Sequence, residues 1–138
     1  MADDYQYLLP DPDPETEPFW EAAKNHELQF QQCTNCQTFR HPPRKPCGNC
    51  GSEKFAWVKV SGEGTLYTHI EVIQPVLPQW RESTPYNIVQ VSIDDAPGVI
   101  IMGNVVEMDG TTLKVGMKVK VTFDNVTDEV TIPRWTPA

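Results

Sequence analysis

The stretch QQCTNCQTFRHPPRKPCGNCGSEKF, residues 31–55, contains every cysteine of this 138-residue chain. Cys33 and Cys36 form one C-x2-C pair, and Cys47 and Cys50 form a second pair ten residues later. Each C-x2-C makes a tight turn that directs two sulfurs toward one point, so two such turns build a shell of four thiolates. In a reducing compartment this spacing favours a metal over disulfides. We therefore predict a four-cysteine metal site around which the local chain folds.

The ligand set decides the role that we expect for the metal. Four thiolates fill a tetrahedral shell, whereas a catalytic zinc keeps one position open for water. We therefore predict a structural Zn²⁺. A rubredoxin-like iron centre uses the same shell, so electron transfer through iron is the alternative that the spacing leaves open. His41, between the two pairs, is interpreted as a loop residue because the four cysteines already complete the shell.

Charge and composition narrow the class of partner. The net charge is −8, and six acids and no base lie in the first 17 residues, so the rest of the chain is close to neutral. This balance argues against nucleic acid as a partner, because phosphate backbones attract a surplus of positive charge. The sequence has no apolar run of the roughly 20 residues that a membrane helix needs. Acids and prolines occupy the place of a secretory signal, so we expect a cytoplasmic protein.

The chain divides into four segments in the sequence. We predict an acidic, proline-rich arm over residues 1–14, a helix and lead-in strand over 15–32, a zinc ribbon over 33–54 and a barrel over 55–138. Proline early in a helix is a start signal, and Pro18 follows Thr16 and Glu17, which predicts a short helix over about residues 16–26.

The second half of the sequence is rich in β-branched and aromatic residues. It predicts two strand segments joined at a bend near Gly62 and Gly64, a proline-rich loop over 74–86, a strand–turn–strand unit around 94–98 and a closing pair of strands. Five strands with glycine bends and no crossover helices indicate a small antiparallel barrel of the OB kind. The fold class that we predict is therefore mostly β, with one short N-terminal helix, a four-cysteine zinc ribbon and a five-stranded OB-type barrel.

The sequence also lacks the usual signatures of catalysis. With all four cysteines assigned to the metal, no thiol remains as a nucleophile. Gly-x-Ser-x-Gly, His-Glu-x-x-His and a phosphate-binding glycine loop are absent from the sequence. We therefore do not expect this chain to catalyse a reaction by itself.

The order of these features resembles one protein family. The chain is similar, over residues 15–135, to the OB-fold proteins with an N-terminal helix and rubredoxin-like zinc ribbon known as domain of unknown function 35. The elements that carry the resemblance are Phe19-Trp20, the four cysteines, Pro42-Pro43-Arg44, Ser61-Gly62-x-Gly64, Pro85-Tyr86 and Val115-Gly116-Met117.

The resemblance implies a partner. Members of the family bind thiolase-superfamily enzymes as non-catalytic subunits, in complexes that make or cleave carbon–carbon bonds in acyl-CoA thioesters. By this resemblance the chain is expected to form a hetero-oligomer with such an enzyme, two copies of each, with the acyl-CoA shared between the two proteins.

Two groups of residues are candidates for these contacts. Arg40, His41, Arg44 and Lys45 concentrate positive charge between the cysteine pairs and are candidates for contact with coenzyme A, the alternative being a solvated loop. The candidates for the partner interface are the aromatic residues Phe19, Trp20, Trp80 and Tyr86. For Trp20, packing on its own barrel is the alternative.

Two other functions remain open in the sequence. The first is a stand-alone module that binds or carries acyl-CoA. The second is an OB protein that binds single-stranded nucleic acid, which requires a basic groove with stacking aromatic rings.

Overall fold

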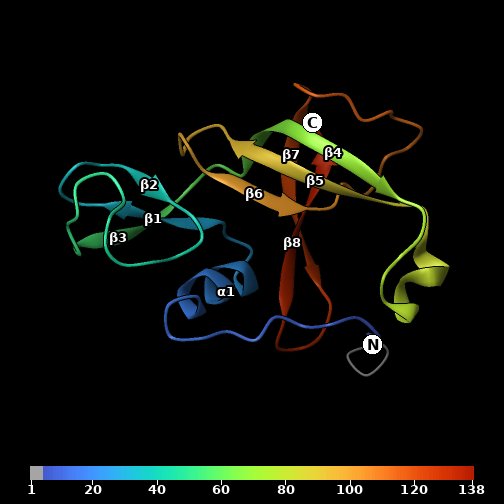
Figure 1. The fold of residues 1–138 in the computed structure, drawn as a ribbon, viewed down its shortest axis with the longest axis horizontal. Coiled ribbons are helices and arrows are strands. Elements are labelled where there is room, and N and C mark those ends of the chain that lie inside the picture. The colour runs from blue at the N-terminus through green and yellow to red at the C-terminus, as the bar shows by residue number, and fades with distance from the viewer. Residues whose placement is uncertain (1–4) are drawn as a thin grey trace.

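The computed structural model describes residues 5–138 (Figure 1). The first acids of the predicted arm, Asp3 and Asp4, lie outside the described residues. None of the helices within residues 5–138 has the length and apolar character that crossing a bilayer requires. The elements are α1 (Glu17–Lys24), the 3-10 helix η2 (Pro78–Ser83) and the strands β1 (Gln29–Cys33), β2 (Phe39–Arg40), β3 (Phe55–Lys59), β4 (Glu63–Val72), β5 (Tyr86–Ile93), β6 (Ile100–Gly103), β7 (Lys118–Asn125) and β8 (Thr131–Pro137).

Helix α1 is the short helix that the sequence predicts. Thr16 precedes its first residue and Pro18 lies in its first turn, where a missing backbone N–H costs nothing. Phe19, Ala22 and Ala23 form its buried face. The helix ends at Lys24, and His26 adopts a left-handed conformation with φ of 58° that turns the chain into β1.

The ribbon is a three-stranded antiparallel sheet in the order β2-β1-β3. The lead-in strand β1 pairs with β3 from Gln29 opposite Lys59 to Cys33 opposite Phe55. Residues 55–59 therefore hydrogen-bond within the ribbon sheet, and the barrel strands begin after the bend at Gly62. In Figure 1 this sheet forms one lobe of the molecule, on the left.

The second sheet is a curled, five-stranded antiparallel half-barrel in the order β6-β5-β4-β7-β8. Its two edges meet where the Val106 N–H donates to the Trp135 carbonyl at 2.7 Å and the Trp135 N–H donates to the Asn104 carbonyl at 2.9 Å. A register shift between Leu66 and Thr68 in β4 adds to the curl. The predicted fold class, mostly β with an OB-type sheet, is confirmed.

One hydrophobic core runs through both parts. Trp135 and Leu66 are buried inside the half-barrel, and Phe19, Leu28 and Phe30 from the helix and lead-in strand belong to the same cluster of packed side chains. Helix α1 thus lies between the two sheets, and its apolar face contributes to the core of the whole described chain.

Candidate metal centre and neighbouring hollow

The four cysteine sulfurs lie together at the tip of the ribbon. All four sulfurs are within 4.8 Å of one another, with 3.6 Å between Cys33 and Cys50 and 3.7 Å between Cys36 and Cys47. Sulfurs bonded at about 2.3 Å to one tetrahedral Zn²⁺ stand about 3.8 Å apart. A disulfide would bring two sulfurs to about 2.05 Å. The residues present therefore match a tetrahedral metal shell.

Two turns of the same construction bring the sulfurs to this geometry. In the first, the Gln37 N–H donates to the Cys33 carbonyl at 2.9 Å, and in the second the Gly51 N–H donates to the Cys47 carbonyl at 2.9 Å. Gly51 has a φ of 79° and Gln37 one of 65°, so both turns close in the left-handed region. The second turn uses glycine, which adopts this conformation without strain.

Hydrogen bonds in these turns favour the thiolate form that a metal requires. The side chains of Asn49 and Thr38 lower the pKa of the Cys36 thiol to about 5. The backbone N–H groups of Cys50 and Asn49 lower the pKa of the Cys47 thiol. A thiolate is the ligand form of cysteine, so these donors prepare Cys36 and Cys47 to bind a cation. At Cys33 the backbone N–H donors are instead outweighed by desolvation and by the neighbouring thiols of Cys50 and Cys36, so the pKa of the Cys33 thiol is raised.

The number of ligands, and not their burial, indicates a closed site. Cys33 and Cys47 are buried, Cys36 is half-buried, and Cys50 is exposed. Four sulfur ligands leave no position for a water or substrate molecule. A metal at this centre would hold the two turns together.

The residues predicted to contact coenzyme A lie between the two cysteine turns, in a segment that we call the inter-turn loop (residues 40–46), and they divide into two pairs. Arg44 and Lys45 are exposed, as a surface role requires. Arg40 is only 4% exposed and its Nε donates to the side-chain oxygen of Gln31 at 2.8 Å, so it belongs to the interior of the ribbon. His41 packs against Phe19 and is half-buried. The sequence pattern groups all four residues in one charged loop. Only the pairing of the strands shows that Arg40 is interior whereas Arg44 and Lys45 are on the surface.

Burial acts strongly on His41. Its ring lies 5.2 Å from the Phe19 ring and 5.1 Å from the Phe30 ring, measured between centroids. Its Nδ1 is buried with no hydrogen-bond partner in residues 5–138. Desolvation lowers the pKa of His41 to about 4, so the ring is neutral near pH 7.

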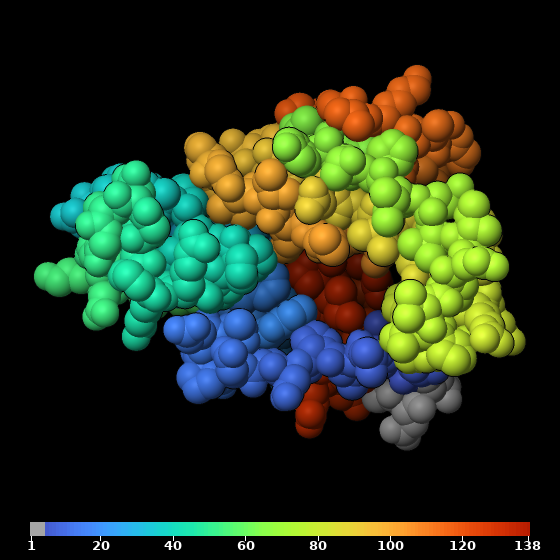
Figure 2. All heavy atoms as spheres, in the orientation of Figure 1, coloured from blue at the N-terminus to red at the C-terminus, as the bar shows by residue number. Residues whose placement is uncertain are grey.

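A hollow on one face of the molecule is floored by β8 (Figure 2). Two cavities open there, of about 320 Å³ and about 280 Å³, and successive residues of β8 line both of them, Ile132 and Pro133 in the first and Arg134 in the second. In Figure 2 the red atoms of the C-terminal strands show between the blue N-terminal segment, the gold strands and the yellow-green loop. We call this pair of cavities the β8 hollow.

The β8 hollow gathers candidate residues that the sequence treats separately. The larger cavity is lined by α1, the inter-turn loop and β6, through Phe19, Trp20, His41 and Met102. The smaller cavity is lined by Trp80, Tyr86, Arg134 and others. All four predicted interface aromatics therefore line this hollow together with His41. Sequence analysis missed Met102 and Arg134, because each is one residue within a strand and no local sequence pattern distinguishes it from its neighbours.

The arm reaches the far side of the same hollow. The Tyr7 ring lies 4.1 Å from the Trp80 ring, and the Trp80 ring lies 4.8 Å from the Tyr86 ring. The Tyr7 hydroxyl also hydrogen-bonds Ser83. Trp80, a candidate for the partner interface in the sequence analysis, is therefore half-buried in an aromatic stack. Tyr7 is a contact that sequence analysis missed.

The two parts of the chain match two family models. Residues 20–56 match the rubredoxin-like zinc ribbon domain of ChsH2, and residues 57–124 match the C-terminal OB-fold domain of ChsH2. Together the two models span the ribbon and most of the half-barrel.

Three relatives are similar in sequence. The chain is 33% identical over 87% of its length to a probable enoyl-CoA hydratase alpha subunit of Thermomonospora curvata. It is 28% identical over 80% of its length to the 3-oxo-4,17-pregnadiene-20-carboxyl-CoA hydratase alpha subunit of Mycobacterium tuberculosis. It spans 37% and 34% of these two longer proteins. A DUF35 domain-containing scaffold protein of Methanothermobacter thermautotrophicus is 24% identical, over 77% of this chain and 78% of that protein.

Two solved structures share the fold. One, described as an Ltp2-ChsH2(DUF35) aldolase, has a chain that superposes with a TM-score of 0.82 at 29% identity, covering 94% of this chain and 98% of that one. The other is a DUF35 protein of unknown function from Sulfolobus solfataricus, with a TM-score of 0.66 at 17% identity over 99% of this chain and 92% of that one, which shows the fold alone. From the matched models, relatives and fold, the chain belongs to the DUF35 family of OB-fold proteins with an N-terminal rubredoxin-like zinc ribbon.

Proposed function

We propose that this chain is a non-catalytic, zinc-binding subunit that binds a thiolase-superfamily enzyme and supports carbon–carbon bond cleavage or formation on acyl-CoA substrates. The observation that carries the proposal is the correspondence with the Ltp2-ChsH2(DUF35) aldolase, which covers 94% of this chain and 98% of the matched one. Because the superposition includes nearly all of both chains, the two chains are suited to the same kind of assembly.

The names of the longer relatives support CoA thioesters as the substrate class. Both hydratase alpha subunits are named for CoA esters, and the chain corresponds to about a third of each. Those proteins carry the similar module within a longer chain. A module that occurs both in hydratase subunits and in an aldolase is better explained as a binding or supporting unit than as the source of one reaction.

The metal centre has a structural part in this proposal. Zn²⁺ bound by Cys33, Cys36, Cys47 and Cys50 would cross-link the two turns and fix the inter-turn loop between them. Arg44 and Lys45, which are exposed on that loop, are suited to contact the phosphates of coenzyme A. Iron in place of zinc is tested by the absorption spectrum of the purified protein, because a ferric tetrathiolate is coloured and zinc is not.

The β8 hollow is the surface that we assign to the partner. Its larger cavity is lined by aromatic rings, prolines and the side chain of Met102, which is 64% exposed. Exposed apolar side chains around a hollow are typical of protein interfaces. The hollow also adjoins the inter-turn loop through His41, so a partner bound there would lie close to Arg44 and Lys45.

The test is an affinity purification of the chain from its native cells, followed by mass spectrometry and by the mass of the intact complex. We expect a thiolase-superfamily enzyme at a mass of two copies of each chain. Met102→Glu should abolish the complex, because it buries a charge in the interface. Val115→Glu, at a residue that is 68% exposed and lines neither cavity, is the matched control. Recovery of the chain alone under mild conditions would contradict the proposal.

Two titrations of the isolated protein address the alternatives. Saturable heat with an acyl-CoA in the absence of a partner would favour a stand-alone acyl-CoA module. Salt-dependent binding of a single-stranded oligonucleotide would favour a nucleic-acid-binding OB protein. We expect neither titration to saturate.

A further inference from the structure

Arg40 carries a buried positive charge without an opposing carboxylate. Its side chain is 4% exposed, and the ion pairs formed within residues 5–138 do not include it. Nε donates to the Gln31 side-chain oxygen and to the Arg44 carbonyl, each at 2.8 Å. Nη1 and Nη2 are buried and have no hydrogen-bond partner among the described residues. A buried charge without hydrogen-bond partners lowers the stability of the fold unless an opposite charge lies close to it.

The strand pairing places Arg40 on the face of the sheet that carries a metal ligand. Gln31 pairs with Arg40, and Cys33 pairs with Phe55. Directly opposed residues point to the same face of a sheet, as do residues two apart on one strand. Arg40, Gln31, Cys33 and Phe55 therefore share one face.

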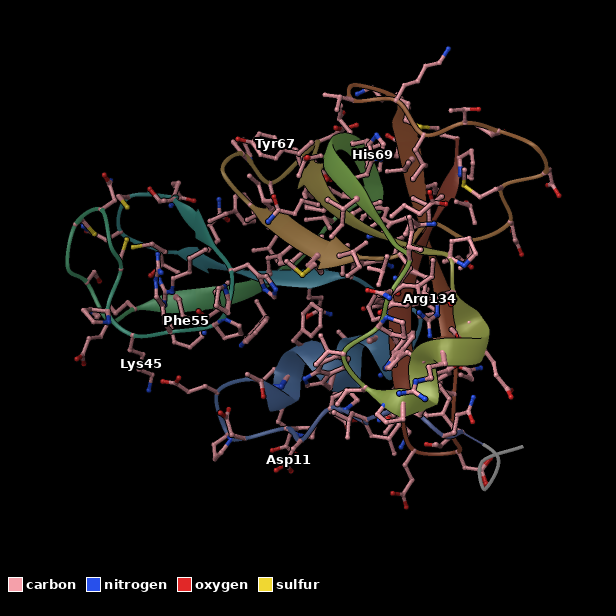
Figure 3. The ribbon with its side chains drawn as sticks, turned by 45° about the vertical axis from the view of Figure 1, so that its right-hand side comes forward. Asp11, Lys45, Phe55, Tyr67, His69 and Arg134 are labelled. Carbon is pink, nitrogen blue, oxygen red and sulfur yellow. The ribbon has the colours of Figure 1, made fainter. Side chains whose placement is uncertain are left out.

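The guanidinium is directed toward the metal end of that face. Its Cζ lies 4.9 Å from the centre of the Phe55 ring, and Phe55 stands opposite Cys33. Figure 3 shows Phe55 in the ribbon lobe, which also holds the sulfur atoms of the cysteine cluster. The cation is thus held against the ring that neighbours the metal centre.

The charge of a loaded centre supplies what Arg40 lacks. Four thiolates and one divalent cation carry a net charge of −2, and a low dielectric strengthens its attraction for a nearby cation. We propose that Arg40 is the counter-charge of the tetrathiolate centre, a positioning residue that raises the affinity of the ribbon for its metal. This inference rests on the metal centre of the proposed function.

The chemistry of arginine suits this task. Guanidinium remains charged at every physiological pH, stacks on an aromatic ring and needs less hydration than an ammonium. Gln31 also accepts from the Arg44 backbone N–H at 2.9 Å, so the same contacts that hold Arg40 hold the inter-turn loop that leads to the second turn. Metal binding and the burial of Arg40 should therefore favour each other.

The experiment measures the zinc affinity of the full chain by competition with a chromophoric chelator. Arg40→Gln should weaken zinc binding ten- to hundred-fold, the range typical of residues that surround metal ligands. Arg40→Lys, which keeps the charge but lacks the Nε contact, should recover most of that loss. Lys45→Gln removes one exposed charge from the same loop and should leave the affinity within about twofold of the wild type.

Repeating the measurement in a Cys50→His variant distinguishes an electrostatic role of Arg40 from a purely structural one. Cys50→His reduces the charge of the loaded centre from −2 to −1, so the effect of Arg40→Gln should be smaller there. Equal losses in Arg40→Lys and Arg40→Gln, or an undiminished effect in the Cys50→His background, would overturn the counter-charge proposal. If the wild type binds no zinc, the metal centre itself fails, whereas wild-type affinity in Arg40→Gln would overturn only the role of Arg40.

Discussion

At the scale of single residues, Gly62 allows the chain to pass from the ribbon into the half-barrel. It has a φ of 85°, and a Cβ built on it would lie 2.5 Å from Cγ1 of Val121. Both the backbone conformation and the close approach of β7 therefore require a residue without a side chain. The sequence predicts the bend here because Gly62 and Gly64 interrupt a β-rich run.

We predict that Gly62→Ala lowers the free energy of unfolding by about 2–4 kcal/mol, through backbone strain and the contact with Val121. Gly98→Ala is the matched control, because Gly98 has a φ of 86° but no atom within 4 Å of a built Cβ. It should cost only about 1–2 kcal/mol. Urea unfolding of both variants checks this, and equal losses would show that the Val121 contact contributes nothing.

His41 makes stability depend on pH. In the unfolded chain the pKa of His41 is near its ordinary value of 6.5, and in the folded chain burial lowers that pKa to about 4. Between these values the unfolded state binds more protons, so the stability that exists above pH 6.5 is lost as the pH falls toward 4. By pH 5 we expect the unfolding free energy to have dropped by about 2 kcal/mol from this group.

The measurement compares urea unfolding of the wild type and His41→Phe at pH 7 and pH 5. Phenylalanine keeps a ring between Phe19 and Phe30 and cannot titrate. The unfolding free energy that His41→Phe loses between pH 7 and pH 5 should therefore be about 2 kcal/mol smaller than the loss in the wild type. Zinc content is measured in both proteins, because protons also compete with a metal for the cysteines. Identical pH dependence in the two proteins would contradict the role of His41.

At the scale of elements, the arm contacts the loop that bears η2. Tyr7 lies on Trp80, which in turn lies on Tyr86, so a segment near the N-terminus and a loop about 70 residues later form one stack. Figure 3 shows the arm residue Asp11 on the side of the molecule where α1 lies. The arm is rich in acids and prolines, but its aromatic residue Tyr7 makes the contact with the loop.

We predict that Tyr7→Ala shifts the tryptophan emission to longer wavelength and lowers stability by about 1 kcal/mol, because an aromatic pair contributes about 0.5–1.5 kcal/mol. Tyr5→Ala is the control, since Tyr5 contacts the Tyr7 ring at 5.3 Å and is not stacked on Trp80. Its emission should match that of the wild type. A wild-type spectrum for Tyr7→Ala would mean that the arm leaves Trp80 exposed in solution.

The sequence predicts the elements well where the signals are local. The cysteine spacing, the proline and acid at the start of α1 and the alternation in the strands each depend on residues a few positions apart, so the helix, the sulfur cluster and the five-stranded sheet are all anticipated. Contacts between segments that are distant in the sequence are not anticipated. The burial of Arg40 depends on Gln31 and Phe55 in neighbouring strands, and the cover over Trp80 depends on Tyr7. Neither pairing leaves a periodic signal in the chain.

At the scale of the whole molecule, two sheets share one core but differ in size. The ribbon sheet has three strands, one of them only two residues long, whereas the half-barrel has five strands around Trp135. A small sheet with little core of its own depends on its metal for stability. We expect the half-barrel, which contributes Leu66, Val91 and Trp135 to the buried core, to persist when the ribbon loosens.

We predict that removing the metal, with a strong chelator or through Cys47→Ser, speeds amide hydrogen exchange in β1, β2 and β3 and leaves β4 and β5 protected. Hydrogen exchange followed by mass spectrometry resolves the two regions, and restoring zinc after chelation should restore protection. Exchange that stays slow in the ribbon without metal would show that the sulfur cluster is not needed to hold it.

The placement of β3 bears on how this module can be exchanged between proteins. The two matched models meet between residues 56 and 57, within β3 (Phe55–Lys59), and not at the bend that follows it. A hybrid joined at that boundary would combine a strand from two parents, and the ring of Phe19 would meet a foreign barrel. Recombination should succeed better when the crossover lies at Ser61 and Gly62, which leaves β3 whole and keeps Phe19 with Phe30 and His41, the rings that it contacts in the ribbon.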